Sequence, residues 1–513
     1  METSRSCRPT REDGTRYRVG TVTETVAPTV TDAYETVIGL ECHVELSTET
    51  KMFCGCRNEF GSAPNTNVCP VCLGLPGSMP VPNERAIEGI VRIGLALGCR
   101  IAPHSIFHRK NYFYPDMPKN FQISQYDLPI CVEGHLDVEV GGEKRRIGIT
   151  RVHMEEDTGK SSHVGATGRI ADAEYSLVDY NRAGVPLVEV VSEPDMRSAE
   201  EARAYLTELR AVLESLGVSD VRMEEGSLRC DANVSVRRVG AAEFGTKVEI
   251  KNLNSIRSLY RAVRYEEDRQ REALDAGQPL VQETRHFDEN AGTTSSMRSK
   301  EFAFDYRYFP EPDLAPLEPD AEWVEKIRAS LPELPAARRA RFESEYGLEP
   351  ARAAQVVADA GTAQFFVDAV GQGASAPAVA NWIAGDLAGL LNEARIDLAD
   401  SRITPTHIAD LVKALDQSEL SSAGAKTALA EAFRTGDSIE TIVEREGLRQ
   451  ISDASALEEV VGRAIAENPG PAEQYRGGKE AALNVILGSV MRQTKGADPK
   501  VVRELLTRRL AEG

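Results

Sequence analysis

The sequence predicts an α+β protein in which a mostly antiparallel sheet is followed by all-helical domains. Before residue 310, short strand-like runs and helical patterns alternate irregularly, without the fixed strand–helix repeat of a parallel sheet. After the proline-rich segment 310–319 (PEPDLAPLEP), strand patterns nearly vanish and helical periodicity takes over. The length of 513 residues is enough for roughly three domains.

The strand-like runs have clear faces. In Thr36–Ser47, the even positions from 38 to 46 are apolar, whereas Glu41, His43 and Glu45 lie at odd positions, which is typical of a half-buried strand. Further strands are expected at Arg145–His153, Pro186–Val191, Ser227–Val236 and Lys247–Lys251. Helices are expected at Glu84–Leu97, Ala199–Leu216, Ile256–Ala276 and, behind the start signal Thr404-Pro405, at His407–Leu415.

These patterns divide the chain into four parts. A polar leader covers residues 1–33 and is expected to be flexible. The sheet domain covers residues 34–319, a helical domain covers 320–420, and a second helical unit covers 421–513. No internal repeat or low-complexity tract interrupts this division.

Composition and charge exclude several classes of protein. Hydrophobic residues make up 41% and charged residues 27%, which argues against a disordered or collagen-like chain. No apolar run reaches the roughly 18 residues of a membrane helix, and no secretory signal begins the chain, so a cytoplasmic location away from membranes is expected. The formal charge of −20 excludes a general nucleic-acid coat. The segment 476–513 is nevertheless basic, with eight basic and four acidic residues.

Four of the nine cysteines form a cluster. The spacing C-x-C…C-x-x-C brings two thiolate pairs within reach of one tetrahedral ion, which predicts structural Zn²⁺. Because sulfur fills all four positions, this ion would stabilise a loop and would leave no open position for catalysis. The alternative is four cysteines that pack as small apolar groups. The residues concerned are Cys54, Cys56, Cys69 and Cys72.

Acidic residues lie on the polar faces of several predicted strands. Glu41, His43 and Glu45 share one face, Glu189 lies within an apolar strand, and three acids follow His153. Asp231 shares a face with Glu225, Arg229 and Asn233. Carboxylates that crowd on one face repel each other unless cations lie between them, and hard oxygen ligands suit Mg²⁺. For any single strand the alternative is an ordinary solvated sheet face.

A basic and aromatic segment, 107–125, supplies positive charge. It carries Arg109, Lys110, Lys119 and Gln122, which are suited to stabilise charge on transferred phosphoryl oxygens. A second such segment, 305–310, is suited to close the same cleft. No G-x-x-x-x-G-K-[ST] sequence occurs, so a nucleotide would not be held by a P-loop.

Six motifs resemble those of one known family, the B subunit of the tRNA-dependent glutamyl/aspartyl amidotransferase. The resemblance runs from about residue 34 to the C-terminus. It implies a catalytic cradle related to glutamine synthetase at 34–319, followed by helical domains of which 421–513 binds tRNA. The motifs are ETVIGLECHVEL (35–46), FHRKNYFYPDMPKNFQISQ (107–125), HMEEDTGKSSH (153–163), SLVDYNRAGVPLVEVVSEPD (176–195), MEEGSLRCDANVSV (223–236) and DYRYFPEPD (305–313).

The resemblance also implies a reaction and its partners. Such a protein would use ATP and Mg²⁺ to phosphorylate the side-chain carboxylate of misacylated Glu-tRNA(Gln) or Asp-tRNA(Asn). A partner amidase, the A subunit, would release ammonia from glutamine, and this ammonia would displace the phosphate to give Gln-tRNA(Gln) or Asn-tRNA(Asn). A small C subunit would complete the heterotrimer. The resemblance leaves open whether one or both tRNAs are substrates.

Individual roles follow from the matched motifs. The resemblance implies a Mg²⁺ site made of Glu41, His43, Glu156, Glu189 and Asp231. Lys110 and Glu156 match polar positions associated with the ammonia route. The expected catalytic residues are Lys110, Glu156 and Arg229, and the expected nucleotide-binding residues are Arg109, Lys119 and Gln122; strand geometry adds Glu155, Glu225 and Arg229 to the acidic face.

Two other functions remain as alternatives. A zinc-stapled RNA-binding scaffold without catalysis would account for the cysteines and the basic tail, but would leave the acids of the sheet without a role. A self-sufficient ATP-dependent ligase that takes free ammonia would need no amidase partner. This chain contains no recognisable amidase or glutaminase motif of its own.

Overall fold

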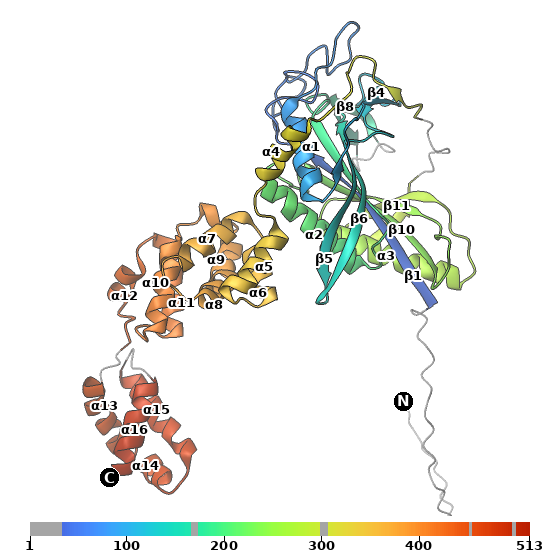
Figure 1. The fold of residues 1–513 in the computed structure, drawn as a ribbon. Helices are drawn as coiled ribbons and strands as arrows, with labels where there is room; N and C mark the ends of the chain where they lie inside the picture. The colour runs from blue at the N-terminus through green and yellow to red at the C-terminus, as the bar shows by residue number, and fades with distance from the viewer. Residues whose placement is uncertain (1–32, 166–172, 298–305, 451–453, 495–498, 513) are drawn as a thin grey trace, which may run out of the picture.

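The structure, a computed structural model, describes residues 33–165, 173–297, 306–450, 454–494 and 499–512. Within these ranges the N-terminal part forms one large sheet (Figure 1). Its strands are β1 (Tyr34–Glu45), β2 (Arg100–Ile101), β3 (His108–Asn111), β4 (Phe121–Ser124), β5 (Cys131–Val140), β6 (Glu143–Glu156), β9 (Pro186–Ser192), β10 (Leu228–Arg238), β11 (Val248–Leu253), β12 (Glu283–Asp288), β13 (Thr293–Ser296) and β14 (Phe309–Pro310).

The strand order is β13-β12-β11-β10-β1-β9-β6-β4-β3-β14, with β5 paired to β6 and β2 paired to β5 outside this path. Among the described strands, β11 and β12 are the one parallel pair. A separate hairpin is formed by β7 (Lys160–Gly165) and β8 (Ala173–Asp179). The central strand β1 therefore lies between β10 and β9, which come from distant parts of the sequence.

Alternation along β1 separates a core face from a polar face. Leu40, Cys42 and Val44 are fully buried, whereas Glu41 and His43 between them are partly exposed. The core face packs with three helices, α1 (Glu84–Ala96), α2 (Ala199–Leu216) and α3 (Ile256–Asp275). The polar face is consequently available for a functional site.

Capping residues fix where these helices begin. The Asn83 side chain accepts hydrogen bonds at the start of α1, and Ser198 Oγ accepts one from the Glu201 amide at 3.1 Å at the start of α2. Gly217 ends α2 in the left-handed conformation, with a φ of 65°. Ser255 caps α3 in the same way, accepting from the Ser258 amide at 3.0 Å.

The rest of the described chain is helical (Figure 1). Its first helix, α4 (Ala321–Ala329), still belongs to the sheet domain, because it packs against α1 and contributes Ile327 to that core. The helices after α4 form two further hydrophobic clusters. The second cluster is built from α5 (Pro335–Tyr346), α6 (Pro350–Val356), α7 (Ala360–Val370), α8 (Ala376–Trp382), α10 (Pro405–Asp416), α11 (Ser422–Thr435) and α12 (Ile439–Glu446), with a π-helical turn at Ile383–Leu387 and α9 (Ala388–Ala394) following α8. The third is built from α13 (Ala454–Glu467), α14 (Pro469–Arg476), α15 (Leu483–Gln493) and α16 (Pro499–Glu512).

The α+β class and the mostly antiparallel sheet are confirmed, and each helix predicted above is present within one or two residues. The expected leader lies outside the described residues except for Ala33. The division predicted at 420/421 lies inside the second cluster, because Ala425, Leu429 and Ile442 are buried with the helices before it. Helical periodicity shows which face of a helix is apolar, but it does not show which helix covers that face. Within the described ranges, no helix combines the length and the apolar character of a membrane span.

Candidate functional site

Three strands bring a histidine and two carboxylates together on the polar face of the sheet. The register places His43 of β1 beside Glu189 of β9, and Glu189 beside His153 of β6. Glu155 lies two residues further along β6 on the same side. One ligand atom each from His43, Glu155 and Glu189 lies within 4.8 Å of the others. Two carboxylate oxygens and one imidazole nitrogen form a donor set that fits a divalent cation.

Positive groups hold these carboxylates ionised although they are buried. Lys110 Nζ lies 3.8 Å from Glu155 Oε1, and Ser124 Oγ donates to the same oxygen at 2.8 Å. Burial alone would raise the pKa of Glu155, but the charge of Lys110 and the hydrogen bond from His153 lower it below its ordinary value. Glu155 is therefore negatively charged at neutral pH and available to a cation.

His153 lies between the two carboxylates. Its Nε2 is 3.1 Å from Glu189 Oε2 and 3.5 Å from Glu155 Oε1. Burial would lower the pKa of His153, but the hydrogen bonds to Glu155 and Glu189 raise it to about 9. Its Nδ1 is buried without a hydrogen-bond partner among the described residues. Two cations, Lys110 and His153, thus balance the two buried carboxylates in this structure.

A second acidic pair lies beside this group. Glu41 and Asp231 face each other in the register of β1 and β10. Asn233 Nδ2 donates to Glu41 Oε1 at 2.9 Å, and Lys251 Nζ donates to Asp231 Oδ2 at 2.8 Å. The same Lys251 lies 3.0 Å from Glu249 Oε1. The pair extends the acidic face across β10 and β11, but each of its carboxylates has a partner of its own.

Arg229 also projects from this face, opposite His43 in the register. Its Nη2 lies 2.6 Å from Asp157 Oδ2 and 4.0 Å from Glu45 Oε1. Burial, together with the adjacent charge of Asp157, raises the pKa of Glu45 to about 8. Arg229 is therefore held in place by a fully buried acid while its own side chain remains partly exposed.

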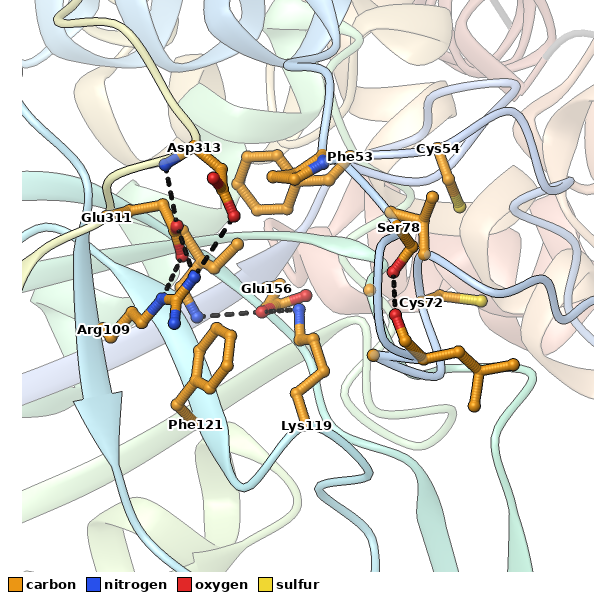
Figure 2. Close-up of a pocket in the computed structure, with 16 residues that line it drawn as sticks. Phe53, Cys54, Cys72, Ser78, Arg109, Lys119, Phe121, Glu156, Glu311 and Asp313 are labelled. Carbon is orange, nitrogen blue, oxygen red and sulfur yellow. Dashed lines mark hydrogen bonds and ion pairs between the residues drawn. The ribbon is translucent and has the colours of Figure 1, made fainter.

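Glu156 lies on the other side of the sheet. Its Oε1 accepts from the Ile123 amide at 2.8 Å and forms an ion pair with Lys119 (Figure 2). It borders a cavity of about 210 Å³ that is also lined by Phe53, Cys72 and Phe121. The expectation that Glu156 joins the other magnesium ligands is not met, because neighbouring residues of a strand project to opposite faces.

Arg109 and Lys119 likewise face this cavity and not the acidic face (Figure 2). Arg109 makes two hydrogen bonds to Glu311, at 2.7 and 2.8 Å, and a longer one to Asp313 at 3.4 Å. Of the expected nucleotide-binding residues, Gln122 alone touches the histidine–carboxylate group, since its Nε2 donates to Glu155 Oε2 at 3.2 Å. Lys110, the neighbour of Arg109 in β3 and an expected catalytic residue, lies on the acidic face, 3.8 Å from Glu155 Oε1.

The aromatic segment that precedes β14 lies along the same face as Lys110. The Asn111 amide donates to the Tyr306 carbonyl at 2.9 Å, and Lys110 Nζ lies 5.1 Å from the centre of the Tyr306 ring. Tyr308 stacks on Tyr126 with ring centres 4.3 Å apart. The described part of the predicted segment 305–310 therefore borders the acidic face, whereas Asp305 lies outside the described residues.

The four clustered cysteines converge on one point. Their sulfur atoms all lie within 4.8 Å of one another, and those of Cys69 and Cys72 are 3.9 Å apart. Sulfur atoms that coordinate one tetrahedral zinc at about 2.3 Å lie about 3.8 Å apart. The arrangement fits a closed Zn²⁺ site, and Cys54 and Cys72 border the cavity shown in Figure 2.

Sequence reasoning missed His153 and Lys251 and gave Glu156 the place of Glu155 as a ligand. The signal was present, because Glu155 and His153 share one parity along β6, as do His43 and Glu41 along β1. Glu225 lies in the turn before β10, where it pairs with Arg222 at 2.9 Å and borders a pocket with Glu45, apart from the group of His43, Glu155 and Glu189.

The fold and this site define a class of protein: a sheet domain with a histidine–carboxylate group on its polar face, joined to helical modules. Residues 36–325 match the family model of the GatB/GatE catalytic domain, and residues 364–510 match that of the GatB domain. The chain belongs to the family of aspartyl/glutamyl-tRNA(Asn/Gln) amidotransferase B subunits. The resemblance found in the sequence is thereby confirmed.

Three relatives illustrate this membership, and each is named as the B subunit of an aspartyl/glutamyl-tRNA(Asn/Gln) amidotransferase. The protein of Carboxydothermus hydrogenoformans is 52% identical over 93% of this chain and 99% of its own length. That of Salinispora arenicola is 55% identical over 94% of this chain and 97% of its own length. That of Frankia casuarinae is 56% identical over 93% and 96% of the two lengths.

Proposed function

We propose that this chain activates the side-chain carboxylate of misacylated Glu-tRNA(Gln), Asp-tRNA(Asn) or both with ATP, and then transfers ammonia to it. The observation that carries the proposal is the group of His43, Glu155 and Glu189 beside Lys110. A carboxylate resists attack by ammonia until one oxygen becomes a good leaving group, and phosphorylation provides that group. Mg²⁺ bound by these three residues would shield the phosphates from the substrate carboxylate.

The remaining residues of the face have roles that follow from charge. Lys110 lies within reach of the same space as Glu155 and would stabilise negative charge on the transferred phosphoryl group. Arg229, fixed by Asp157 at 2.6 Å, would orient the carboxylate of the aminoacyl group. Glu41 and Asp231 would widen the metal site when ATP brings further Mg²⁺.

The two faces of β6 support a separation of reagents. ATP and the aminoacyl end would approach the acidic face, while ammonia would arrive through the cavity that Glu156 borders. Gln122 lies on the acidic side, where its Nε2 donates to Glu155 Oε2 at 3.2 Å and to the backbone carbonyl of Glu156 at 2.7 Å. Because Glu155 and Glu156 are adjacent in β6, a neutral molecule that passes Glu156 would emerge beside the activated carboxylate.

The proposed partners are an amidase subunit, a small third subunit and the tRNA, in the cytoplasm where aminoacyl-tRNAs are made. The relatives are named as B subunits, which supports a complex of several different chains. The exposed basic side chains Lys479 and Arg492 of the third helical cluster would contact tRNA phosphates. Zn²⁺ at the four cysteines would be structural, because its coordination is complete.

The test is phosphoryl transfer from ATP to Glu-tRNA(Gln) by the complete heterotrimer. We expect Glu155→Gln to abolish Mg²⁺-dependent transfer, because it removes one ligand charge. Glu143→Gln, which changes an exposed acid at the other end of β6, serves as the matched control and should retain wild-type turnover. Full turnover by Glu155→Gln would reject the metal site.

The same assay separates the alternatives. A scaffold without catalysis would bind tRNA but would not consume ATP with any substrate. A self-sufficient ligase would amidate with ammonium salts at full rate and would gain nothing from the amidase and glutamine. If this chain works as proposed, the assay should show slow amidation with ammonium salts and fast amidation with glutamine once the amidase is added.

A further inference from the structure

Lys51 is a lysine in an unusual position. Its side chain is fully buried, in the loop that leads from β1 to the first pair of clustered cysteines. Its Nζ donates to the Tyr180 carbonyl at 3.2 Å. Among the residues that the structure describes, no carboxylate oxygen lies within ion-pair distance, 4.0 Å, of this nitrogen. A buried ammonium group without a counter-charge is strongly unfavourable, so an anion is expected nearby.

The cysteine cluster is one candidate for that anion, and the Glu156 carboxylate, which already pairs with Lys119, is another. A Cβ atom built on Gly184 would lie 3.4 Å from Cys72 Cβ, 3.6 Å from Lys51 Cδ and 3.8 Å from Glu156 Oε2, so all three side chains border the same small space. The backbone agrees, since the Lys51 amide donates to the Cys56 carbonyl at 3.0 Å.

The net charge of a zinc–thiolate site gives a reason for a cation such as Lys51 beside it. Four thiolates around one Zn²⁺ carry a net charge of about −2, and a site buried on one side needs positive charge close by. We propose that Lys51 is the buried counter-charge of the zinc–thiolate site, and that it connects the metal to the segment 180–185. This inference rests on the zinc assignment of the proposed function and goes beyond it.

The segment 180–185 carries the connection toward the acidic face. Lys51 holds the Tyr180 carbonyl, and the Met52 amide donates to the Gly184 carbonyl at 2.7 Å. The same segment then holds Asp157, because the Gly184 amide donates to the Asp157 carbonyl at 2.9 Å and the Asp157 amide donates to the Val185 carbonyl at 2.8 Å. Asp157 in turn binds Arg229. Lys51 is therefore a positioning residue between the metal and the site.

The first experiment measures zinc release in the full heterotrimer with a chromophoric chelator. We expect Lys51→Met to weaken zinc binding by about 10- to 100-fold, in the range found when groups around metal ligands are removed. Lys51→Arg, which keeps the charge, should stay closer to the wild type. Lys326→Met, at an exposed lysine of α4, is the control and should bind zinc normally. Unchanged zinc release from Lys51→Met would overturn the proposal.

The second experiment compares the sign of the Tm shift caused by Lys51→Met in the zinc-loaded and in the zinc-free protein. In zinc-loaded protein Lys51→Met should lower the Tm, because the thiolates lose their counter-charge. In protein stripped of zinc the same substitution should raise the Tm, because it removes a buried charge that has lost its anion. An equal shift in both states would show that Lys51 acts by packing alone.

A measurement on the wild type keeps the inference testable if the variant does not fold. Removal of zinc should increase amide hydrogen exchange at Met52, Gly184 and Asp157, and should leave the distant β11–β12 pair unchanged. Protection that stays the same at all three amides would reject the connection. A wild-type protein without bound zinc would overturn this inference but not the proposed amidation, which is measured separately.

Discussion

The side chains of Glu155 and Glu156, which are adjacent in β6, project to opposite faces of the sheet. Glu155 accepts from Ser124 Oγ at 2.8 Å and faces His43 and Glu189, whereas Glu156 accepts from the Ile123 amide at 2.8 Å and pairs with Lys119. One carboxylate therefore belongs to the histidine–carboxylate group and its neighbour to the cavity behind it. The two substitutions should have different consequences.

We predict that Glu155→Gln abolishes amidation with either nitrogen source, because activation of the carboxylate fails. Glu156→Gln should retain ATP-dependent phosphoryl transfer and lose at least tenfold in glutamine-dependent amidation, with a smaller loss when ammonium salts are supplied. Paired assays with glutamine and with ammonium chloride measure this difference. Equal losses with both nitrogen sources in Glu156→Gln would place Glu156 in the activation step instead.

The pH dependence of stability should report on His153. Its pKa is about 9 in the folded protein, against about 6.5 when unfolded. The protonated ring therefore stabilises the fold fully below about pH 6.5, and this stabilisation is lost as the pH rises toward 9. Its size is on the order of 3 kcal/mol.

His153→Gln should remove this contribution. Urea unfolding between pH 6.5 and 9, without added magnesium, should show a smaller decline of the unfolding free energy for the variant than for the wild type. Glu45, whose pKa is raised to about 8, contributes to both proteins, so the comparison isolates His153. Parallel pH profiles would contradict the assigned protonation of this ring.

The fold was largely predictable because its signals are local. The alternation of apolar and polar residues over Thr36–Ser47 predicted β1, and the cap at Thr404 predicted the start of α10. Which helices share a core was not predictable, since α11 and α12 bury apolar faces of ordinary character against α10. That choice depends on the shapes of surfaces brought together after the helices form.

The site was predictable in its chemistry and less so in its membership. His43, Glu189 and Lys110 were found from motifs and strand faces, and the register brings all three near Glu155. Alternation along β6 places Glu155 on the polar face with His153, and Glu156 on the opposite face, so this choice was open to sequence reasoning. Whether that face of β6 meets Glu189 of β9 depends on the hydrogen-bond register between distant strands, which the pattern within one strand does not record.

Packing between α1 and β5 gives a stability prediction. A Cβ on Gly94 would lie 2.4 Å from Cys131 Sγ and 3.0 Å from Cys131 Cβ, so Gly94→Ala should destabilise the sheet domain by about 1–3 kcal/mol. Gly89→Ala, in the same helix, would meet a Leu46 methyl group at 3.3 Å. That control should be nearly neutral, because alanine favours the helix by about 1 kcal/mol. Calorimetry of both variants checks the ranking, and equal Tm values would contradict it.

Charge reversal in the third helical cluster tests tRNA binding. Deletion from residue 476 would remove α15 and α16 and expose Leu457 and Val461, so substitution is the cleaner test. The double variant Lys479→Glu and Arg492→Glu should weaken tRNA binding and reduce the slope of log affinity against log salt by about one per lost phosphate contact. Lys326→Glu is the control for a charge reversal at an exposed lysine elsewhere. An unchanged slope would place the tRNA elsewhere.

The proposed cation site has a consequence for which insertions and deletions this protein can tolerate. His43, Glu155 and Glu189 come from three strands whose mutual register decides that they meet. Loss or gain of a single codon within β9 would turn Glu189 toward the hydrophobic interior and bring a valine in its place. Among natural relatives, insertions and deletions should therefore lie in the connections between these strands. Within the strands themselves, the relatives should differ by substitutions alone.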